Sequence, residues 1–594
     1  MSVEVNGQPI GNPVIDHLDL WSSAYVKKAA TGRGSNGTIS PYGIQKLREL
    51  ILELAVRGRL VPQDPDDEPA SVLLERVAAE KEAASNKKGR RKPKATPEVT
   101  GEERAFELSK GWEWTRLGAL AEVVRGVTYK KHDAQESAFE GGIALLRANN
   151  IGMSVNFDNL VYVPQQLVRD EQQLVKGDLL IAMSSGSASL VGKAAQFDSN
   201  MSATFGAFCG VVRSYSALLF KYLGFFLQTP FYRSQTMDAG KGIGINNLNK
   251  GSLENLVVTV PPLAEQHRIV AKVDELMDLC DQLEQQQTDS LQAHQTLVET
   301  LLRTLVAASD AESTQQAWNR IAENFDTLFT TEESIDQLKQ TILQLAVMGR
   351  LVPQDPNDEP ASEFLRRLAE KKEELIKEGK IKKHKVLSNI DQEEKPFSLP
   401  DGWAWARLPE IGELARGKSK HRPRNDPSLY IDGITPMVQT GDVAKADPVI
   451  TTYTALYNEK GVAQSRLWPK GTMCITIAAN IADTGVLGFE ACFPDSVVGF
   501  IPFDELIEVK YFDYFVRTAK EHLEDFAPST AQKNINLEIL GKLLVPLPPQ
   551  KELNRVVAKV DELMDLCDTL KTRIQHAQTP QVHLADAVVE QAIA

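Results

Sequence analysis

Residues 412 to 419, GELARGKS, have the types and spacing of the phosphate-binding loop of nucleotide hydrolases. In such a loop, backbone amides and a lysine surround the phosphates between a buried strand and a helix. The four matching positions are Gly412, Gly417, Lys418 and Ser419. However, Pro423 and Pro427 fall where the helix should run, and the pattern arises by chance in roughly one chain in fifty of this length. We therefore expect no ATP site here.

Other signatures of catalysis are weak or missing from the sequence. GKGIGIN (240–246) lacks the preceding strand and acidic partner of a dinucleotide site, and it predicts a flexible turn. HExxH, GxSxG and the Asn/Asp-Pro-Pro-Tyr/Phe of amino-methyltransferases do not occur. The five cysteines form no CxxC pair and have no histidine at ligand spacing. We expect no catalytic site, no metal site and no disulfide framework.

The basic residues of the phosphate-loop match indicate a different chemistry. The segment continues as GELARGKSKHRPR, with a cation at every second position: Arg416, Lys418, Lys420, Arg422 and Arg424. In an extended segment this period places all five on one face, which suits a row of phosphates. Two further basic runs, KKGRRKPK (87–94) and KEGKIKKHK (377–385), fit either a solvated linker or phosphate contact.

The net charge of −14 argues at first against nucleic acid, because DNA-binding proteins generally present a cationic surface. The acidity is uneven, since residues 108–265 carry 14 Lys and Arg against 13 Asp and Glu, a sum of +1. No segment is long and apolar enough to cross a bilayer, and no signal-peptide pattern opens the sequence. We expect a cytoplasmic protein.

The sequence contains a long internal repeat. LRELILELAVRGRLVPQDPDDEPAS (47–71) returns at 338–362 with 19 of 25 positions identical. Two further blocks are also duplicated: GWEWTRL (111–117) as GWAWARL (402–408), and RIVAKVDELMDLCDQL (268–283) as RVVAKVDELMDLCDTL (555–570). The segments between these blocks diverge almost completely. A tandem of two such long units indicates a pseudo-two-fold molecule.

The repeated blocks predict the helices that hold the variable segments. Residues 268–308 have apolar residues every three or four positions without Gly or Pro, which predicts a coiled-coil-like helix of roughly 60 Å. Its copy starts near Pro549 and runs towards the C-terminus, with Pro580 as a candidate break. Helices over 43–57 and 334–348 should end at the glycines that follow, Gly58 and Gly349.

The variable segments combine short apolar runs bounded by Gly, Pro and Lys with amphipathic stretches, so each predicts a mixed α/β lobe. The predicted fold class is mixed α/β, with two globular lobes joined by long antiparallel coiled-coil-like helices. The expected domains are an N-terminal helical region with a basic linker (1–107), a first lobe (108–266), a helical spacer with a basic linker (267–399), a second lobe (400–553) and a C-terminal spacer helix (554–594).

Two variable lobes alternating with the duplicated blocks GRLVPQDPxDEPAS, GWxWxRL and RIVAKVDELMxLCDxL resemble the specificity (S) subunit of type I restriction-modification systems. The resemblance implies that each lobe is a target recognition domain for one half of a bipartite, asymmetric site in double-stranded DNA. It implies that the helices set the spacer and dock two methyltransferase (M) subunits, which methylate adenine with S-adenosylmethionine. Restriction (R) subunits would add ATP- and Mg-dependent cleavage, and the S subunit itself would need no cofactor.

Candidate DNA contacts are polar or basic residues in predicted loops. In the first lobe they are Arg125, Lys130, Lys131, Arg147, Asn149, Asn150, Lys241, Asn247 and Asn249. In the second lobe they are Gln439, Gln532, Lys533, Asn534, Asn536 and the five alternating cations. Asparagines that recur in both lobes also fit turn formers or phosphate ligands. The alternative function is a helical protein-protein scaffold without DNA contact, and a nucleotide-driven enzyme ranks third.

Overall fold

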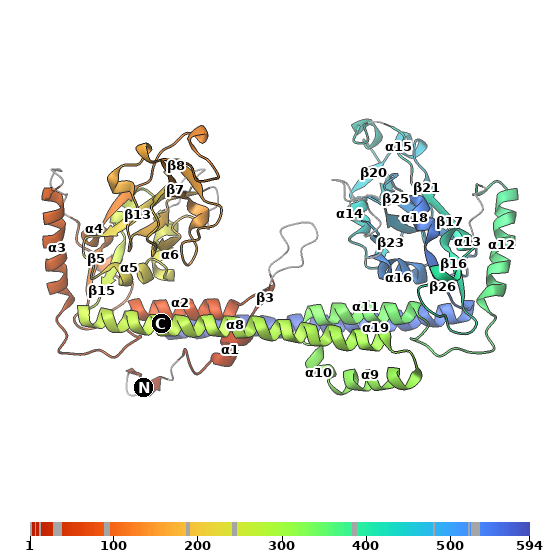
Figure 1. Ribbon diagram of the computed structural model, residues 1–594, viewed down its shortest axis with the longest axis horizontal. Helices are drawn as coiled ribbons and strands as arrows, with labels where there is room; N and C mark the ends of the chain where they lie inside the picture. Colours follow the sequence, from red (N-terminus) through yellow and green to blue (C-terminus); the bar gives the residue numbers. More distant parts are fainter. Residues whose placement is uncertain are drawn as a thin grey trace. The chain divides into compact units, whose positions relative to one another are not determined.

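The computed structural model describes residues 3–594 except 6–7, 11–12, 28–38, 88–95, 186–189, 240–245, 383–388, 422, 479–480, 521–522 and 524–534. The chain forms two compact units, each with a helical frame and a lobe of strands and short helices (Figure 1). Unit 1 is Met1–Ser290 with Ala577–Ala594, and unit 2 is Leu291–His576.

Three helical segments form the frame of each unit. In unit 1 they are α2 (Tyr42–Val56), the first part of α8 (Leu263–Ala307) and the last part of α19 (Gln550–Ile593). In unit 2 they are α11 (Glu332–Val347), the first part of α19 and the last part of α8. The long helix predicted over 268–308 is thus confirmed as the 45-residue α8. The candidate break is wrong, because α19 continues through Pro580.

Apolar side chains at helical spacing explain why these frames assemble. In unit 1, Ile269, Val273 and Cys280 of α8 are fully buried in one cluster with residues of α2 and with Ala585 of α19. Ion pairs flank this seam, since Arg48 of α2 contacts Asp281 at 2.6 Å and Glu284 at 2.7 Å. Burial of a continuous stripe on each helix stabilises the frame far more than helix propensity does.

Glycines end the first frame helix of each unit as predicted. Gly58 and Gly349 have φ of +71° and +70°, a left-handed conformation that glycine adopts without strain. The N–H of Arg59 donates to the Leu54 carbonyl, and that of Arg350 donates to the Leu345 carbonyl, both at 2.9 Å. These are Schellman bonds, which satisfy carbonyls that the helix end leaves without partners.

The first lobe contains two main sheets. A four-stranded antiparallel sheet has the order β11-β9-β13-β6: β6 (Ala121–Arg125), β9 (Leu179–Ala182), β11 (Ala194–Gln196) and β13 (Cys209–Ser214). A second sheet has the order β12-β7-β8, with β7 and β12 parallel: β7 (Gly142–Leu146), β8 (Val161–Pro164) and β12 (Ala203–Phe205). The lobe's helices are α4 (Leu117–Leu120), α5 (Phe220–Phe226), α6 (Pro230–Ala239) and α7 (Lys250–Glu254).

The second lobe repeats both sheets and adds a strand to each. The order β17-β25-β22-β23-β19 comprises β17 (Gly412–Arg416), β19 (Val449–Ile450), β22 (Met473–Thr476), β23 (Thr484–Leu487) and β25 (Val497–Pro502). The order β20-β18-β24-β21 comprises β18 (Thr435–Met437), β20 (Ala455–Tyr457), β21 (Leu467–Trp468) and β24 (Ala491–Cys492). Among its described residues the helices are α13 (Leu408–Ile411), α14 (Thr440–Val443), α15 (Glu459–Ala463), α16 (Lys510–Thr518) and α18 (Leu537–Lys542).

Smaller elements complete the two units. The paired short strands are β1 (Val3–Val5) with β2 (Gln8–Ile10), β3 (Val26–Lys27) with β4 (Ile39–Ser40), β5 (Glu113–Arg116) with β15 (Val257–Val260), β10 (Ser184–Ser185) with β14 (Asn246–Asn247), and β16 (Ala404–Arg407) with β26 (Leu544–Leu547). The remaining α-helices are α1 (Leu18–Ser23), α3 (Ala70–Lys87), α9 (Ala311–Glu323), α10 (Phe325–Leu328) and α12 (Ala361–Lys377).

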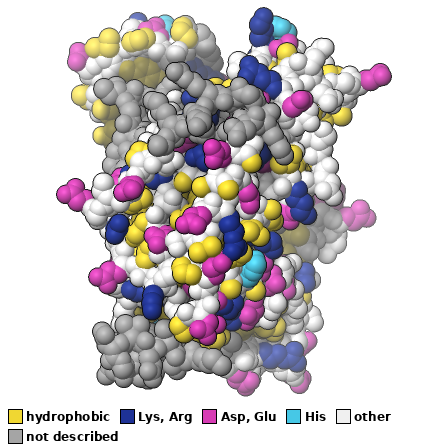
Figure 2. All heavy atoms as spheres, turned by 90° about the vertical axis from the view of Figure 1, so that its left-hand side faces the viewer, with side chains coloured by type: hydrophobic (Ala, Val, Ile, Leu, Met, Phe, Trp, Pro, Cys, Tyr) yellow, Lys and Arg dark blue, Asp and Glu magenta, His cyan; other side chains and the backbone are white. Residues whose placement is uncertain are grey.

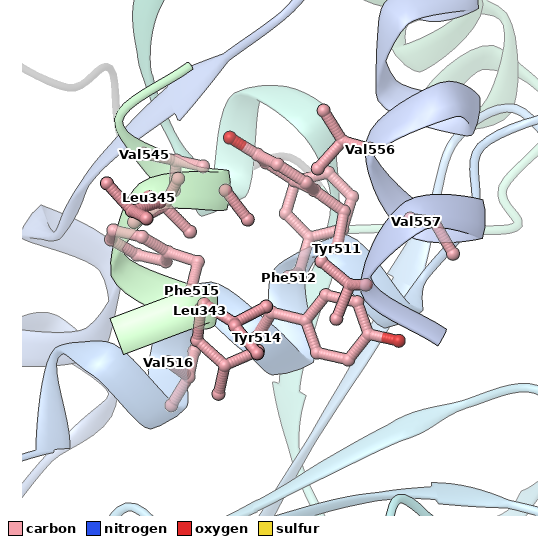
Figure 3. Packing of buried hydrophobic residues seen from close by; sticks show 14 of the residues in the cluster. Leu343, Leu345, Tyr511, Phe512, Tyr514, Phe515, Val516, Val545, Val556 and Val557 are labelled. Carbon is pink, nitrogen blue, oxygen red and sulfur yellow. The ribbon is translucent and has the colours of Figure 1, made fainter. Parts of the chain in front are cut away.

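A helix of the second lobe joins that lobe to its frame. Figure 3 shows aromatic residues of α16 beside Leu343 and Leu345 of α11 and Val556 and Val557 of α19. Tyr511, which is fully buried, donates its hydroxyl to the Pro546 carbonyl of β26. The lobe therefore shares one apolar core with its frame, which restricts movement between them.

A buried carboxylate at the start of each long helix accepts hydrogen bonds from two other segments of its unit. We call this duplicated arrangement the joint. In unit 1 the indole N–H of Trp112 donates to Glu265 at 2.9 Å, and the amide of Gln63 donates to the same carboxylate at 2.6 Å. In unit 2 Glu552 accepts from Trp403 at 3.1 Å and from Gln354 at 3.4 Å. Each carboxylate thereby ties together the three near-identical sequence blocks: GRLVPQDP, GWxWxRL and the long helix.

Ion pairs accompany the joint in both units. Arg268 contacts Asp67 at 2.6 Å, and Arg555 contacts Asp358 at 2.7 Å, with each aspartate largely buried. The arginine of each GWxWxRL block, Arg116 or Arg407, contacts a glutamate 13 residues before it at 2.8 Å. Trp112 and Trp403, buried and bonded to the two carboxylates, are therefore structural residues of these contacts.

Removing one donor from the joint should destabilise its unit. Trp403→Phe deletes the indole N–H and leaves the buried Glu552 short of a partner, which should lower the free energy of unfolding of unit 2 by about 1–3 kcal/mol. Urea unfolding followed by circular dichroism measures this decrease. Trp405→Phe is the matched control, because its half-buried ring packs on Phe397; equal decreases in the two variants would contradict the role of the joint.

The joint should also make stability depend on pH. Burial raises the pKa of Glu265 and of Glu552 above the ordinary value, so the folded state holds these protons more tightly than the unfolded state. The stability contributed by each carboxyl should therefore fall as the pH rises from about 4 through the folded pKa. The free energy of unfolding of the wild type minus that of Glu265→Gln/Glu552→Gln should fall over this range in urea titrations. A difference that rises with pH would contradict the assignment.

Candidate nucleic-acid interface

Three strand ends of the first lobe meet at one edge. β7 and β12 run parallel, with Phe205 opposite Leu146. Val127, just beyond β6, forms a parallel bridge with Gly206, and its N–H donates to the Phe205 carbonyl at 2.7 Å. The outer two strand ends are therefore about 10 Å apart, two strand spacings. We call this the lobe 1 edge. Its side chains are Arg125, the last residue of β6, and Arg147 and Phe208, which follow β7 and β12.

The second lobe forms the same edge from equivalent strands. β18 and β24 pair in parallel, with Met437 opposite Cys492, and the Val438 N–H donates to the Cys492 carbonyl at 2.8 Å. The Gly417 N–H donates to Val497 at 2.9 Å, as the Gly126 N–H donates to Cys209 at 3.3 Å. We call this the lobe 2 edge, and it carries Arg416, Lys418, Gln439 and Asp495.

The pair Arg125-Gly126 of the first lobe recurs as Arg416-Gly417 in the second. The glycine of each pair permits the neighbouring strands to approach closely. A Cβ atom on Gly126 would lie 2.1 Å from the Gly206 carbonyl oxygen, and one on Gly417 would lie 2.3 Å from the Phe493 oxygen. The octapeptide that matches the phosphate-binding loop is therefore largely strand, with Gly412 to Arg416 paired antiparallel to β25. Its backbone is paired in a sheet and does not form a turn around a phosphate group.

From the last residue of β17 onward, basic residues alternate with buried ones. Arg416, Lys418 and Lys420 are exposed, whereas Gly417 and Ser419 are buried. The Lys418 carbonyl accepts from Ser465 at 2.8 Å, and the Lys420 N–H donates to Gln464 at 2.6 Å, which fixes the extended backbone. Arg416, Lys418 and Lys420 therefore lie on one face of an extended segment, whereas Arg424 lies in a turn, outside this alternation.

One acidic residue pairs with two cations of this row. Arg416 donates from Nε to the Asp495 carbonyl at 3.0 Å, and Arg424 pairs with the Asp495 carboxylate. His421 contacts Asp426 at 2.6 Å, and the hydrogen bonds that Asp426 accepts from Ser428 lower its pKa to about 2. Lys418 and Lys420 are therefore the better candidates for phosphate contact. Arg422 lies outside the described residues.

Several candidates of the first lobe are exposed as contact requires. Lys130, Lys131, Asn149 and Asn247 are exposed, and Arg147 is half-buried. Asn150 is only 1% exposed, and its amide donates to the carbonyls of Asn156 and Asp158 at 3.0 and 3.1 Å. It shapes a loop and is not available for contact with DNA. Lys241 of this lobe, and Gln532, Lys533 and Asn534 of the other, lie outside the described residues.

The recurring asparagines Asn249 and Asn536 cap short helices. The Asn249 side chain accepts from the Ser252 N–H at 2.9 Å, and the Asn536 side chain accepts from the Ile539 N–H at the same distance. Both precede equivalent helices, α7 and α18. Of the two interpretations left open, the turn-forming one therefore accounts for these residues.

Phe208 is a candidate that the sequence did not reveal. Its side chain is 71% exposed in the turn between β12 and β13, at the lobe 1 edge. A phenylalanine beside glycines in FGAFCG was the available signal, but the sequence did not place this turn next to Arg125. The equivalent turn of the second lobe contains Asp495 instead.

The described residues hold no group of ligands that could bind a metal ion. Burial raises the pKa of the Cys209 thiol to about 12 and that of Cys280 to about 11, so these thiols are poor nucleophiles. Acidic and basic side chains are interspersed over the face drawn in Figure 2. Within the described part of the chain, every helix is too short or too polar to span a membrane.

Comparison with known proteins agrees with this architecture. A family model described as type I restriction modification DNA specificity domain matches residues 109–293 and 400–578. The specificity subunit of the type I restriction enzyme EcoAI of Escherichia coli is 38% identical over 98% of this chain and 99% of its own length. The EcoEI specificity subunit of Escherichia coli is likewise 38% identical, over 98% and 99%. The EcoKI specificity subunit of Escherichia coli strain K12 is 25% identical over 82% and 89%.

The two matched segments contain the two lobes and the starts of the long helices that follow them. The matches at 38% identity extend over 98% of this chain, so they span both lobes and both frames. The chain therefore belongs to the family of type I restriction-modification DNA specificity subunits.

Proposed function

We propose that this specificity subunit reads a bipartite, asymmetric DNA sequence, with each lobe reading one half. The lobes share their strand order, the close backbone contact at Gly126 and Gly417, and the capped helices. Their edges nevertheless carry different side chains, Arg147 and Phe208 in the first lobe and Gln439 and Asp495 in the second. Two lobes with the same backbone arrangement but different exposed side chains at their edges suit two different half-sites. This observation supports the proposal most directly. Base readout needs side chains at groove edges, while shared cations contact phosphates.

The duplicated frame suits two copies of one partner, which we propose to be methyltransferase (M) subunits. Exposed ion pairs recur at equivalent positions of the two long helices. Lys272 contacts Glu275 at 2.8 Å on α8, and Lys559 contacts Glu562 at 2.9 Å on α19. The same helices would fix the number of unread base pairs. In this proposal the M subunits methylate adenine with S-adenosylmethionine, and restriction (R) subunits supply ATP- and Mg-dependent cleavage. The S subunit catalyses nothing and binds no cofactor.

Shared phosphate contacts account for the acidic composition. A chain with a net charge of −14 is repelled by DNA at long range, so its net charge supplies no attraction. If the M subunits contribute cations around the duplex, this chain needs only the local rows at its two edges. The scaffold alternative, by contrast, gives the exposed edge residues no role.

Exchange of one lobe should change half of the recognised sequence. Replacing residues 108–265 with the equivalent segment of a relative should alter one half-site and leave the other and the spacer unchanged, because each lobe packs on its own frame. Sequencing of methylated adenines in cells that express the chain with its M subunit gives the motif. A wild-type chain that directs no bipartite methylation would overturn the proposed function, and a change in both half-sites would contradict modular reading.

Neutralising the alternating cations should weaken binding without changing the sequence read. For the complex with Lys418→Ala/Lys420→Ala, the slope of log affinity against log salt should become shallower by about 0.9 for each DNA phosphate that is no longer neutralised. Lys470→Ala is the matched control in the same lobe. β17 and β22 both run antiparallel to β25, so Lys470, which precedes β22, lies at the opposite end of the sheet. An equal change in the control would contradict the assignment.

A further inference from the structure

One position is equivalent in the two lobes but carries a different side chain. Arg147 follows β7, and Gln439 follows the equivalent strand after one intervening residue. Their backbone angles agree, with φ and ψ of −124° and 173° for Arg147 and −103° and 169° for Gln439. Each N–H donates to the side chain three residues later, to Asn150 at 2.9 Å and to Asp442 at 2.8 Å.

Asn150 and Asp442 also hold the following loop close to Arg147 and Gln439, respectively. Asn150 and Asp442 are 1% and 4% exposed. Asn150 donates to two carbonyls in the loop before β8, and Asp442 accepts from Thr454 at 3.0 Å in the loop before β20. Because these loops precede equivalent strands, both lobes fix the backbone at the variable position by equivalent means.

The two side chains can reach a ligand from this fixed backbone. The Arg147 guanidinium donates from Nη2 to the Asn159 carbonyl at 3.1 Å, and Asn159 itself has a φ of +52°. A guanidinium carries five N–H donors, so this single bond orients the group and leaves donors for a bidentate contact. Gln439 is exposed at the lobe 2 edge.

Resting on the proposed function, we infer that Arg147 and Gln439 are equivalent base-reading residues that specify different base pairs. An arginine binds guanine O6 and N7 through two parallel hydrogen bonds, whereas a glutamine binds adenine N6 and N7. The half-site read by the first lobe therefore contains a G·C pair contacted by Arg147. The half-site read by the second lobe contains an A·T pair contacted by Gln439.

The neighbouring residues agree with a division into residues that contact bases and residues that hold the backbone in place. The capping asparagines, Asn249 and Asn536, are identical in both lobes because they make identical bonds. Asn150 and Asp442 keep one role with similar side chains. Arg147 and Gln439 share a backbone environment that demands neither residue type, so the difference between them is free to encode sequence.

Exchange of these residues tests the inference in the complex with the M subunit. Arg147→Gln should change one G·C pair to A·T in the half-site assigned to residues 108–265, and Gln439→Arg should make the opposite change in the other half-site. Arg147→Ala and Gln439→Ala should reduce discrimination roughly ten- to hundredfold at the same single positions, measured by binding to duplexes that vary one base pair at a time. Lys176→Gln is the control, because Lys176 precedes β9 and lies at the opposite end of its sheet from Arg125.

The outcomes separate this inference from the proposed function. Wild-type methylation of a bipartite motif establishes the function whatever the variants do. If all four variants keep the wild-type preference at every position, the base-reading role is overturned and the function stands. Uniform weakening across all duplexes would also overturn it, because it would identify Arg147 and Gln439 as phosphate contacts. Circular dichroism confirms that each variant is folded before binding is measured.

Discussion

Much of this structure depends on a carboxylate that is buried at the start of each long helix. Glu265 and Glu552 accept hydrogen bonds from a tryptophan at the base of the lobe and from a glutamine after the first frame helix. A buried carboxylate is costly unless its partners are in place, so it holds three distant segments in one arrangement. This requirement explains why those segments are nearly identical in the two halves of the chain while the lobes between them diverge.

Inside the lobes, divergence is restricted by a second constraint, the close approach of three strand ends. Gly126 and Gly417 lie so near the opposite backbone that a side chain would collide with it. Buried Asn150 and Asp442 then hold the adjoining turn and loop. With the backbone fixed in this way, exposed positions at the edge are free to differ, which is what a protein needs to read two different half-sites on one scaffold.

The phosphate-loop pattern illustrates how local sequence and tertiary structure can disagree. The letters of GELARGKS fit a nucleotide-binding turn, but most of that segment is a strand paired in a sheet. Placement of Lys418 and Lys420 on an exposed, extended face then favours a linear array of phosphates as the partner of their charge. Spacing alone could not separate these outcomes, because it does not record which backbone groups are already bonded.

The sequence by itself determined the internal repeat, the long helix over 268–308, the glycine caps at Gly58 and Gly349, the mixed class of the lobes and the family. The first four follow from local periodicity, backbone preference or direct likeness between segments, and the family follows from the resemblance of the duplicated blocks to known specificity subunits. Only the tertiary structure decided that Asn150, Asn249 and Asn536 have supporting roles, that Phe208 lies beside Arg125, and that Arg147 and Gln439 are equivalent. The reason is physical: which side chains lie together at a strand end depends on pairing between segments that are distant in the chain, and the divergent lobe sequences carry no local signal of it.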